Sequence, residues 1–289
     1  MKRMRFTPHP PPPGAPVVGS HAILLHPQGE KERSGGLDAS DQVWQGALVF
    51  ARIGAVLMLI PGIGESYVPP RIRLSLALVV SLALWPMIAG VLPPLPASVG
   101  GMAGWIIREV VVGLMIGALL RSFMTALATA GEIVSLQTTL AFAQTANPMQ
   151  ASPGSTLGAF LMLLGTTLIF ATNTHHLFIA GLVGSYELIA PARPLVTGDF
   201  VTLAVRTLGD AFMLGVQLSA PLLVFALIFN LASGLVGRVM PSFQVFFAAA
   251  PLSILLGLSV FALSLGVVGT VFIDRYRALA NVFVGGAGG

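Results

Sequence analysis

Cysteine is absent from this 289-residue chain, and charged residues make up only 9% of it. Without cysteine there can be no disulfide bonds and no cysteine-ligated metal sites. Charged residues form about 25% of an ordinary soluble domain, so the low charge excludes that class. The net charge is +4 and no basic run is longer than a few residues, so nothing points to nucleic acid as a partner.

Motifs of several enzyme classes are also missing. The chain has no GxxxxGK[ST] phosphate-binding loop, no HExxH zinc motif and no nucleophile elbow around a serine. His175 and His176 are adjacent, but neighbours on a helix point about 100° apart, which favours a polar helix break over a metal site. We therefore expect no enzymatic activity and no cofactor, and the energy for any transport must come from elsewhere.

Apolar residues dominate the chain, with a hydrophobic fraction of 55% and a mean hydropathy of +0.88. A membrane helix needs about 20 mostly apolar residues. Six segments fit this requirement: 43–60, 74–92, 105–136, 156–190, 205–236 and 243–273. Asn173 and its polar neighbours interrupt the fourth segment. The sequence therefore predicts an all-α, polytopic membrane protein of six helices, or seven if the fourth segment folds back at Asn173.

Several of these segments are too long for simple spans. A helix over residues 105–136 would be roughly 48 Å long, whereas the bilayer core is about 30 Å thick. Pro221 and Pro251 lie inside two other segments, where each removes a backbone hydrogen bond and can kink the helix. Such breaks survive in a bilayer only where protein or a cavity covers them. We expect long, tilted, broken helices that are buried in a larger assembly.

The third segment carries a polar stripe and a small-residue pair. The stripe consists of Arg121, Thr125, Glu132 and Ser135. Charges within a span usually face protein or water; the alternatives are an internal salt bridge or a helix end that reaches the headgroups. Gly113 with Gly117, and Gly154 with Gly158, form GxxxG pairs that permit close helix packing.

The N-terminal 40 residues differ in composition from the rest. They are rich in proline, and no apolar run follows Lys2, Arg3 and Arg5 as a signal peptide would require. We expect 1–40 to be a disordered extension, 41–277 the helical domain and 278–289 a short Gly-rich tail. A mis-assigned start codon is an alternative origin for the extension.

Four stretches give the chain a family resemblance. They are FARIGAVLMLIPGIG with the following VPPRIRLSLAL (50–78), GEIVSLQTTLAFAQTANP (131–148), FATNTHHLFIAGLVGSYELIAP (170–191) and GRVMPSFQVFFAAAPLSILLGLSV (237–260). Over about residues 43–277 the chain resembles the FliR family of flagellar export proteins, called SctT in injectisomes. The family usually has Gln where this chain has Ser242, and the Pro-rich extension lies outside its pattern.

The resemblance implies a fold, a location and partners. FliR-like subunits join FliP-like and FliQ-like subunits in a cone of helix hairpins around a conduit in the bacterial inner membrane, at the flagellar basal body. An FlhB-like protein wraps the cytoplasmic mouth, and unfolded secretion substrates pass through. The chain would then be a structural subunit of the flagellar export gate. The alternatives are an injectisome export-gate subunit, a multi-helix solute carrier and a passive membrane scaffold.

The resemblance also implies site residues. The loop that follows the third segment would form a plug inside the conduit, made by Leu140, Ala141, Phe142, Ala143 and Gln144. The alternative is a solvent-exposed connector. Arg121, Glu132 and Arg238 are expected to be structural polar residues. Arg238 would hydrogen-bond carbonyls at a helix end or pair with an acidic group, unless it anchors the chain to headgroups.

Overall fold

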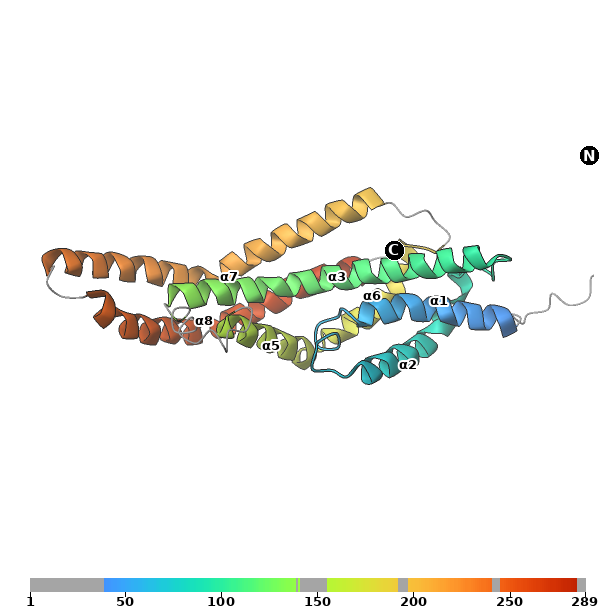
Figure 1. Ribbon diagram of the computed structural model, residues 1–289, viewed down its shortest axis with the longest axis horizontal. Helices are drawn as coiled ribbons and strands as arrows, with labels where there is room; N and C mark the ends of the chain where they lie inside the picture. Colours follow the sequence, from blue (N-terminus) through green and yellow to red (C-terminus); the bar gives the residue numbers. More distant parts are fainter. Residues whose placement is uncertain (1–38, 139, 141–154, 192–196, 241–244, 285–289) are drawn as a thin grey trace, which may run out of the picture. The chain divides into compact units, whose positions relative to one another are not determined.

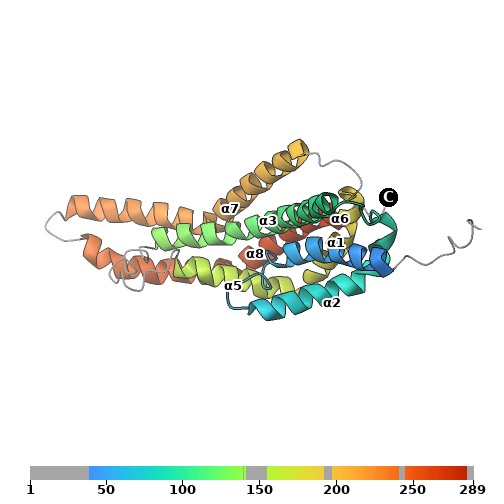
Figure 2. The same ribbon diagram turned by 45° about the vertical axis from the view of Figure 1, so that its right-hand side comes forward.

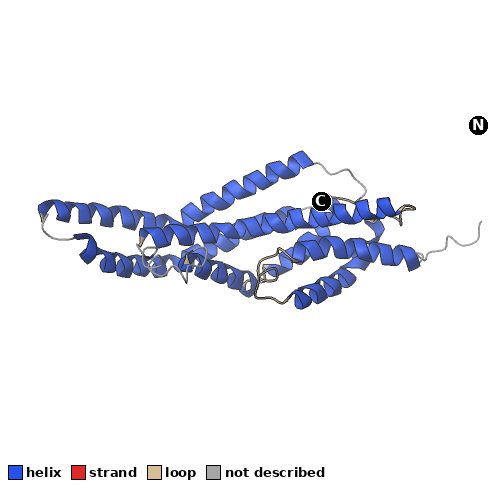
Figure 3. Cartoon of the chain, viewed as in Figure 1, coloured by secondary structure: helices blue, strands red, loops and turns tan. Residues whose placement is uncertain are grey.

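The computed structural model describes residues 39–138, 140, 155–191, 197–240 and 245–284. All regular structure in these ranges is helical (Figure 3). The expected extension lies almost wholly outside the described residues. Seven α-helices and one short 3₁₀ turn, η1 (Ala89–Val91), are described: α1 (Ala39–Leu57), α2 (Pro70–Ile88), α3 (Val99–Gln137), α5 (Thr156–Ala171), α6 (His175–Leu188), α7 (Thr197–Val239) and α8 (Val245–Val284). This confirms the all-α class, and a break around Asn173 divides the fourth expected segment into α5 and α6, as the seven-helix alternative requires.

Local sequence explains where several helices begin. Pro70 is the first residue of α2, a position whose backbone N–H has no helical partner in any case. Ser98 precedes α3, and its side chain accepts a hydrogen bond from the Gly101 amide (3.1 Å). Ser155 caps α5 in the same way, with Gly158 N as the donor (3.0 Å).

Three helices, α3, α7 and α8, are longer than hydropathy predicted, and α7 begins at Thr197 rather than near residue 205. α3 begins at Val99, before Trp105, because the Ser98 cap outweighs the glycines of its first turns. α8 continues to Val284, beyond Ile273, although Asp274, Arg275 and Arg277 end the apolar run. Tyr276, Ala280 and Phe283 are all buried and recur with helical spacing, so the packed face persists through the charged stretch.

Four of the described helices are long and apolar enough to cross a membrane, and the bent pair α5–α6 makes a fifth. The four are α3, α7, α8 and the segment Pro70–Val91 that contains α2. The first segment, expected to be a span, is not among them. Its helix α1 contains Asp41, Gln45 and Arg52, and the last two are buried against the rest of the chain rather than placed in lipid.

α3 is the central helix of the packed unit. It packs against α1, α5, α7 and α8, while α2 lies against α1, and α6 and α7 lie against α8 (Figures 1 and 2). In the most apolar window of α3, 56% of the residues are buried within the chain, compared with 17% for α2. The core is therefore organised around α3, and α2 leaves most of its apolar surface uncovered.

The Gly113–Gly117 pair lets α1 and α3 approach closely. A Cβ atom at Gly113 would collide with the Arg52 carbonyl oxygen and come within 2.8 Å of Ala55 Cβ. A Cβ atom at Gly117 would lie 2.8 Å from Leu59 Cβ. The packing role predicted for this pair is confirmed, since no larger residue fits at this spacing.

The break between α5 and α6 bends the chain by 77°. Asn173 adopts a positive φ of 57°, a conformation that asparagine tolerates better than other non-glycine residues. Arg277 of α8 stabilises the break by donating to Thr172 O (3.0 Å) and to Thr174 Oγ1 (3.1 Å). The break is thus a defined turn whose free carbonyl is satisfied by a distant helix.

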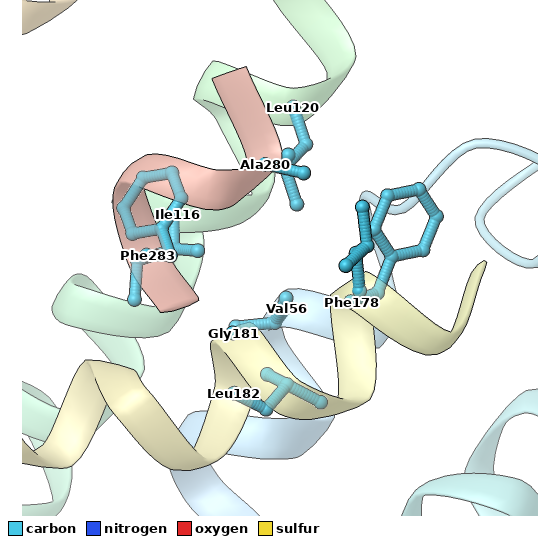
Figure 4. A pocket seen from close by; sticks show the side chains of 9 residues that line it. Val56, Ile116, Leu120, Phe178, Gly181, Leu182, Ala280 and Phe283 are labelled. Carbon is cyan, nitrogen blue, oxygen red and sulfur yellow. The ribbon is translucent and has the colours of Figure 1, made fainter. Parts of the chain in front are cut away.

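A small apolar cavity lies where α1, α3, α6 and α8 meet (Figure 4). Its volume is about 10 Å³, and its lining, which includes Val56, Ile116 and Phe283, is apolar throughout. A buried water needs two or more polar partners, and this lining offers none from its side chains. The interior is therefore dry one helical turn away from Arg52.

The left-handed residue at the break gives a test of the fold. Asn173 is exposed, so substitutions act there mainly through the backbone. Asn173→Gly should leave the melting temperature of the detergent-purified protein unchanged or raised, whereas Asn173→Val should lower it by an amount equivalent to about 1–2 kcal/mol. Asn230→Val, at an exposed position within α7, is the matched control and should have a small effect. Equal destabilisation by both valines would contradict the assigned turn.

Candidate functional site

Arg52 carries a fully buried charge, because its side chain is completely inaccessible to solvent. It lies in the middle of α1, an otherwise mainly apolar helix that packs on α3. An isolated charge in such a place costs far more than folding can recover. Its position therefore requires partners for every donor of the guanidinium group.

Arg52 obtains these partners from α3 and from the end of α6. Its Nε donates to Glu109 Oε2 at 2.6 Å, and Glu109 is fully buried as well. Nη1 donates to the Ser185 carbonyl oxygen (3.1 Å), and Nη2 donates to the Ile189 carbonyl oxygen (3.0 Å). The Tyr186 ring lies under the guanidinium, with Arg52 Cζ 3.9 Å from the ring centroid. We call Arg52, Glu109, Ser185, Tyr186 and Ile189 the Arg52 cluster.

A second arginine extends the Arg52 cluster toward the α6–α7 connection. Arg108 Nη2 donates to the Ala190 carbonyl oxygen (3.0 Å), and Nη1 lies 3.9 Å from Glu109 Oε1. Glu109 thus faces two cations. Arg52 joins α1 to α3 through this carboxylate and to the end of α6 through two carbonyl oxygens. The cluster satisfies the carbonyls at the C-terminal end of α6 in the way that basic side chains often do.

Sequence reasoning missed Glu109 and Tyr186. The available signal was Arg52 itself, because an arginine inside an apolar segment requires an acid elsewhere in the apolar part of the chain. Glu109 meets that requirement, since it lies in the long apolar run of α3. Which acid pairs with Arg52 depends on how α1 and α3 align, and one sequence does not reveal that alignment.

Glu132, near the end of α3, links that helix to the start of α5. Its Oε1 accepts a hydrogen bond from the backbone N–H of Ser155, the residue that caps α5. Next to it, a Cβ atom at Gly131 would collide with the Gly158 backbone, so α3 and α5 touch with no side chain between them. We call Gly131, Glu132, Ser155 and Gly158 the loop junction. The junction fixes where the intervening residues leave α3 and where they rejoin α5.

The expected plug residues fall on that intervening segment. Leu140 is helical and half-buried, whereas Ala141, Phe142, Ala143 and Gln144 lie outside the described residues. Their role in a plug therefore stays a prediction. Thr138, just before them, is buried and bonded to the Val134 carbonyl oxygen (2.9 Å).

The residues of the polar stripe on α3 lie in different environments. Arg121 is partly exposed and forms an ion pair with Glu65 of the α1–α2 connection (3.7 Å), which is the internal salt bridge left open above. Thr125 is exposed, whereas Ser135 is fully buried. Within the chain, the stripe does not form one continuous water-facing surface. Each member is positioned by its own neighbours.

The remaining polar candidates lie at helix ends. Arg238 is exposed in the last turn of α7, and the residues directly after Met240 are outside the described ranges. Its expected pairing stays a prediction. His175 is the first residue of α6, with its ring 5.3 Å from the Phe170 ring and 4.3 Å from the His176 ring. This stacked arrangement at the break matches the interpretation of the histidines as a polar helix break.

The sequence of the whole helical unit matches one family model. Residues 43–279 match the model for bacterial export proteins, family 1. The chain belongs to this family of bacterial export proteins. The match spans every helix described above except the last few residues of α8 and the start of α1, so the family and the packed unit coincide. The membership and the apolar helices identify the chain as a multi-pass protein of the inner membrane.

Curated members of the export family are similar over most of the chain. A flagellar biosynthetic protein FliR of Caulobacter vibrioides is 53% identical over 242 residues, covering 84% of this chain and 96% of the relative. A flagellar biosynthetic protein FliR of Escherichia coli is 28% identical, covering 80% of this chain and 89% of the relative. A Yop proteins translocation protein T of Yersinia pestis is 29% identical over 147 residues, which is 50% of this chain.

The Arg52 cluster predicts a large effect of single substitutions in this export protein. Arg52→Ala leaves Glu109 buried without its close partner, which costs about 3–5 kcal/mol. We expect a strong loss of membrane-integrated protein and a lower melting temperature in detergent. Arg52→Lys keeps the charge but not the fork of donors, so it should recover only part of the loss. Arg71→Ala, at an exposed position of α2, is the control. Wild-type stability of Arg52→Ala would show that the cluster contributes nothing.

The loop junction predicts a local effect. Glu132→Ala removes the acceptor of the Ser155 amide and should loosen the start of α5 by about 1–3 kcal/mol. Limited proteolysis should then cut faster between α3 and α5, while Glu132→Gln, which keeps a side-chain oxygen, should resemble the wild type. Glu187→Ala, exposed on α6, controls for loss of an acid. An unchanged cleavage rate in Glu132→Ala would refute the anchoring role.

Proposed function

We propose that this chain is the FliR-type structural subunit of a flagellar export gate, through which unfolded flagellar proteins cross the inner membrane. The observation that carries the proposal is the 53% identity to a flagellar biosynthetic protein FliR over 96% of that relative's length. Similarity of this extent covers the packed core as well as the connections between helices. The family model over residues 43–279 supports the coarser part of the proposal, a role in protein export.

The uncovered apolar surface supports a role within a complex. In the most apolar windows, only 17% of residues are buried for α2, 33% for α7 and 22% for α8. At 43 residues, α7 would be roughly 65 Å long, about twice the thickness of the bilayer core. Helices that extend so far beyond the lipid need protein to cover their apolar faces. FliP-like, FliQ-like and FlhB-like subunits are the partners that the family resemblance provides.

The flagellar assignment is favoured over two of the alternatives, an injectisome subunit and a solute carrier. The injectisome relative, Yop proteins translocation protein T, matches only 50% of this chain, whereas flagellar relatives match most of it. A solute carrier would need its own substrate site among charged or polar groups near the middle of the membrane. Here the buried charges of the described helices, Arg52 and Glu109, are paired with each other.

The same proposal gives the segment after α3 the role of a plug in the conduit. Two observations support it: the family resemblance of residues 131–148, and the loop junction, which holds both ends of the segment against α3 and α5. The two ends of a plug must stay fixed while its middle moves aside for a passing polypeptide. Apolar side chains such as Leu140 and Phe142 would exclude water from a narrow neck and so block ions.

Deletion of residues 140–143 tests both parts of the proposed function. The shortened chain should still assemble with FliP-like and FliQ-like subunits, but the membrane should become leaky because an apolar constriction is removed. The measurement is ion conductance, or growth inhibition, in cells that express all three subunits. Deletion of 285–288, also four residues, is the control and should not raise conductance.

The outcomes distinguish failure of the plug assignment from failure of the export-gate proposal. A complex that assembles with the 140–143 deletion and conducts no more than wild type removes the plug assignment and leaves the segment as a connector. Failure of the wild-type chain to co-purify with FliP-like and FliQ-like subunits would instead contradict the export-gate proposal itself.

A further inference from the structure

A second, larger cavity lies between α3, α7 and α8, away from the Arg52 cluster and the loop junction. Its volume is about 350 Å³. Phe123 of α3 and the apolar side chains of Leu203, Leu214 and Leu279 form one part of the lining. The rest is polar or charged and includes Arg206, Asp210 and Arg275. The cavity therefore combines an apolar wall with charged groups at one opening between helices.

The charges at this cavity have no ion-pair partner within the described ranges. Arg206, Asp210 and Arg275 are exposed, and none forms an ion pair or hydrogen bond with any residue in the described ranges. Arg206 and Asp210 lie four residues apart on α7, a spacing that permits pairing, yet no ion pair joins them. Two guanidinium groups against one carboxylate leave an excess of one positive charge. An anion can contact both arginines without displacing an existing partner.

The position of the arginines along the helices restricts the ligand. The apolar stretch of α7 begins at Phe200, and Arg206 follows it by roughly 9 Å. On α8 the apolar run ends at Ile273, and Arg275 lies two residues, roughly 3 Å, beyond that end. Because both arginines line one cavity, they come together where the start of α7 meets the end of α8. Arginine side chains beside an apolar surface keep their charged ends in a polar environment, such as the phosphate layer of a lipid.

We propose that this cavity binds an anionic phospholipid. The phosphate lies between Arg206 and Arg275, whose guanidinium forks match phosphate oxygens in charge and geometry. An acyl chain lies along the apolar wall formed by Phe123, Leu214 and Leu279. Asp210 opposes the phosphate, which limits the affinity and disfavours doubly charged headgroups. Basic pockets between membrane helices bind acidic lipids by this chemistry. The lipid site does not depend on the proposed export role.

The test is lipid binding to the full-length chain purified from membranes in detergent. Native mass spectrometry would titrate dioleoyl phosphatidylglycerol against wild type and against Arg206→Gln/Arg275→Gln. We expect the double variant to bind about tenfold or more weakly, because it loses two charge-assisted contacts. Arg71→Gln, which removes an exposed arginine from α2, should bind within about twofold of wild type. If the double variant is not recovered, Arg275→Lys serves instead, with a smaller loss because the charge remains.

Three further binding measurements complete the test. Asp210→Asn should bind phosphatidylglycerol more tightly than wild type, since a repulsive charge is removed. Dioleoyl phosphatidylcholine should bind weakly, and soluble glycerol 3-phosphate should not compete at millimolar concentration, since it lacks the acyl chains. Equal binding by the arginine variants and the Arg71→Gln control would overturn the proposal. A loss of binding in Asp210→Asn, or full competition by glycerol 3-phosphate, would also overturn it.

Discussion

A positive charge that water cannot reach sets the main constraint on this fold. Arg52 is fully buried one turn from a dry apolar cavity, so its guanidinium must be neutralised by protein alone. Glu109 supplies the counter-charge, and the end of α6 supplies two carbonyl oxygens. The requirement brings together three helices that are distant in sequence. Gly113 permits this geometry, because any side chain there would force the backbone of Arg52 away from α3.

Buried polar groups are also paired by hydrogen bonds at two other joints of the chain, the start and the end of α5. Glu132 satisfies the first free amide of α5, and Arg277 satisfies the carbonyl left open where α5 ends. Each joint uses one long side chain from a neighbouring helix. The outer surface follows a different rule, because α2 and much of α7 and α8 present apolar residues outward. A chain whose interior polar groups are paired and whose outer surface is largely apolar is suited to be one part of a larger membrane assembly.

Hydropathy and residue spacing were enough to predict the helical class, the break at Asn173 and the glycine contact of Gly113, because these depend on local composition and spacing. The ends of α3 and α8 were placed wrongly, since a serine cap and an inward-facing Tyr276 outweigh local hydropathy. The start of α7 was placed eight residues too late. The Arg52–Glu109 pair could not be predicted, because pairing depends on the alignment of two helices. The plug residues 141–144 stay a prediction from resemblance alone.

The broken pair α5–α6 has a consequence for biosynthesis. Neither half is long enough to cross a bilayer, at 16 and 14 residues, so the emerging chain presents an ambiguous hydrophobic stretch to the insertion machinery. The donor that satisfies the open Thr172 carbonyl is Arg277, which is synthesised 105 residues later. Until α8 emerges, that carbonyl lacks this partner, and within a bilayer it needs another donor or water. The path of the chain through this region is therefore settled only after α8 has been synthesised.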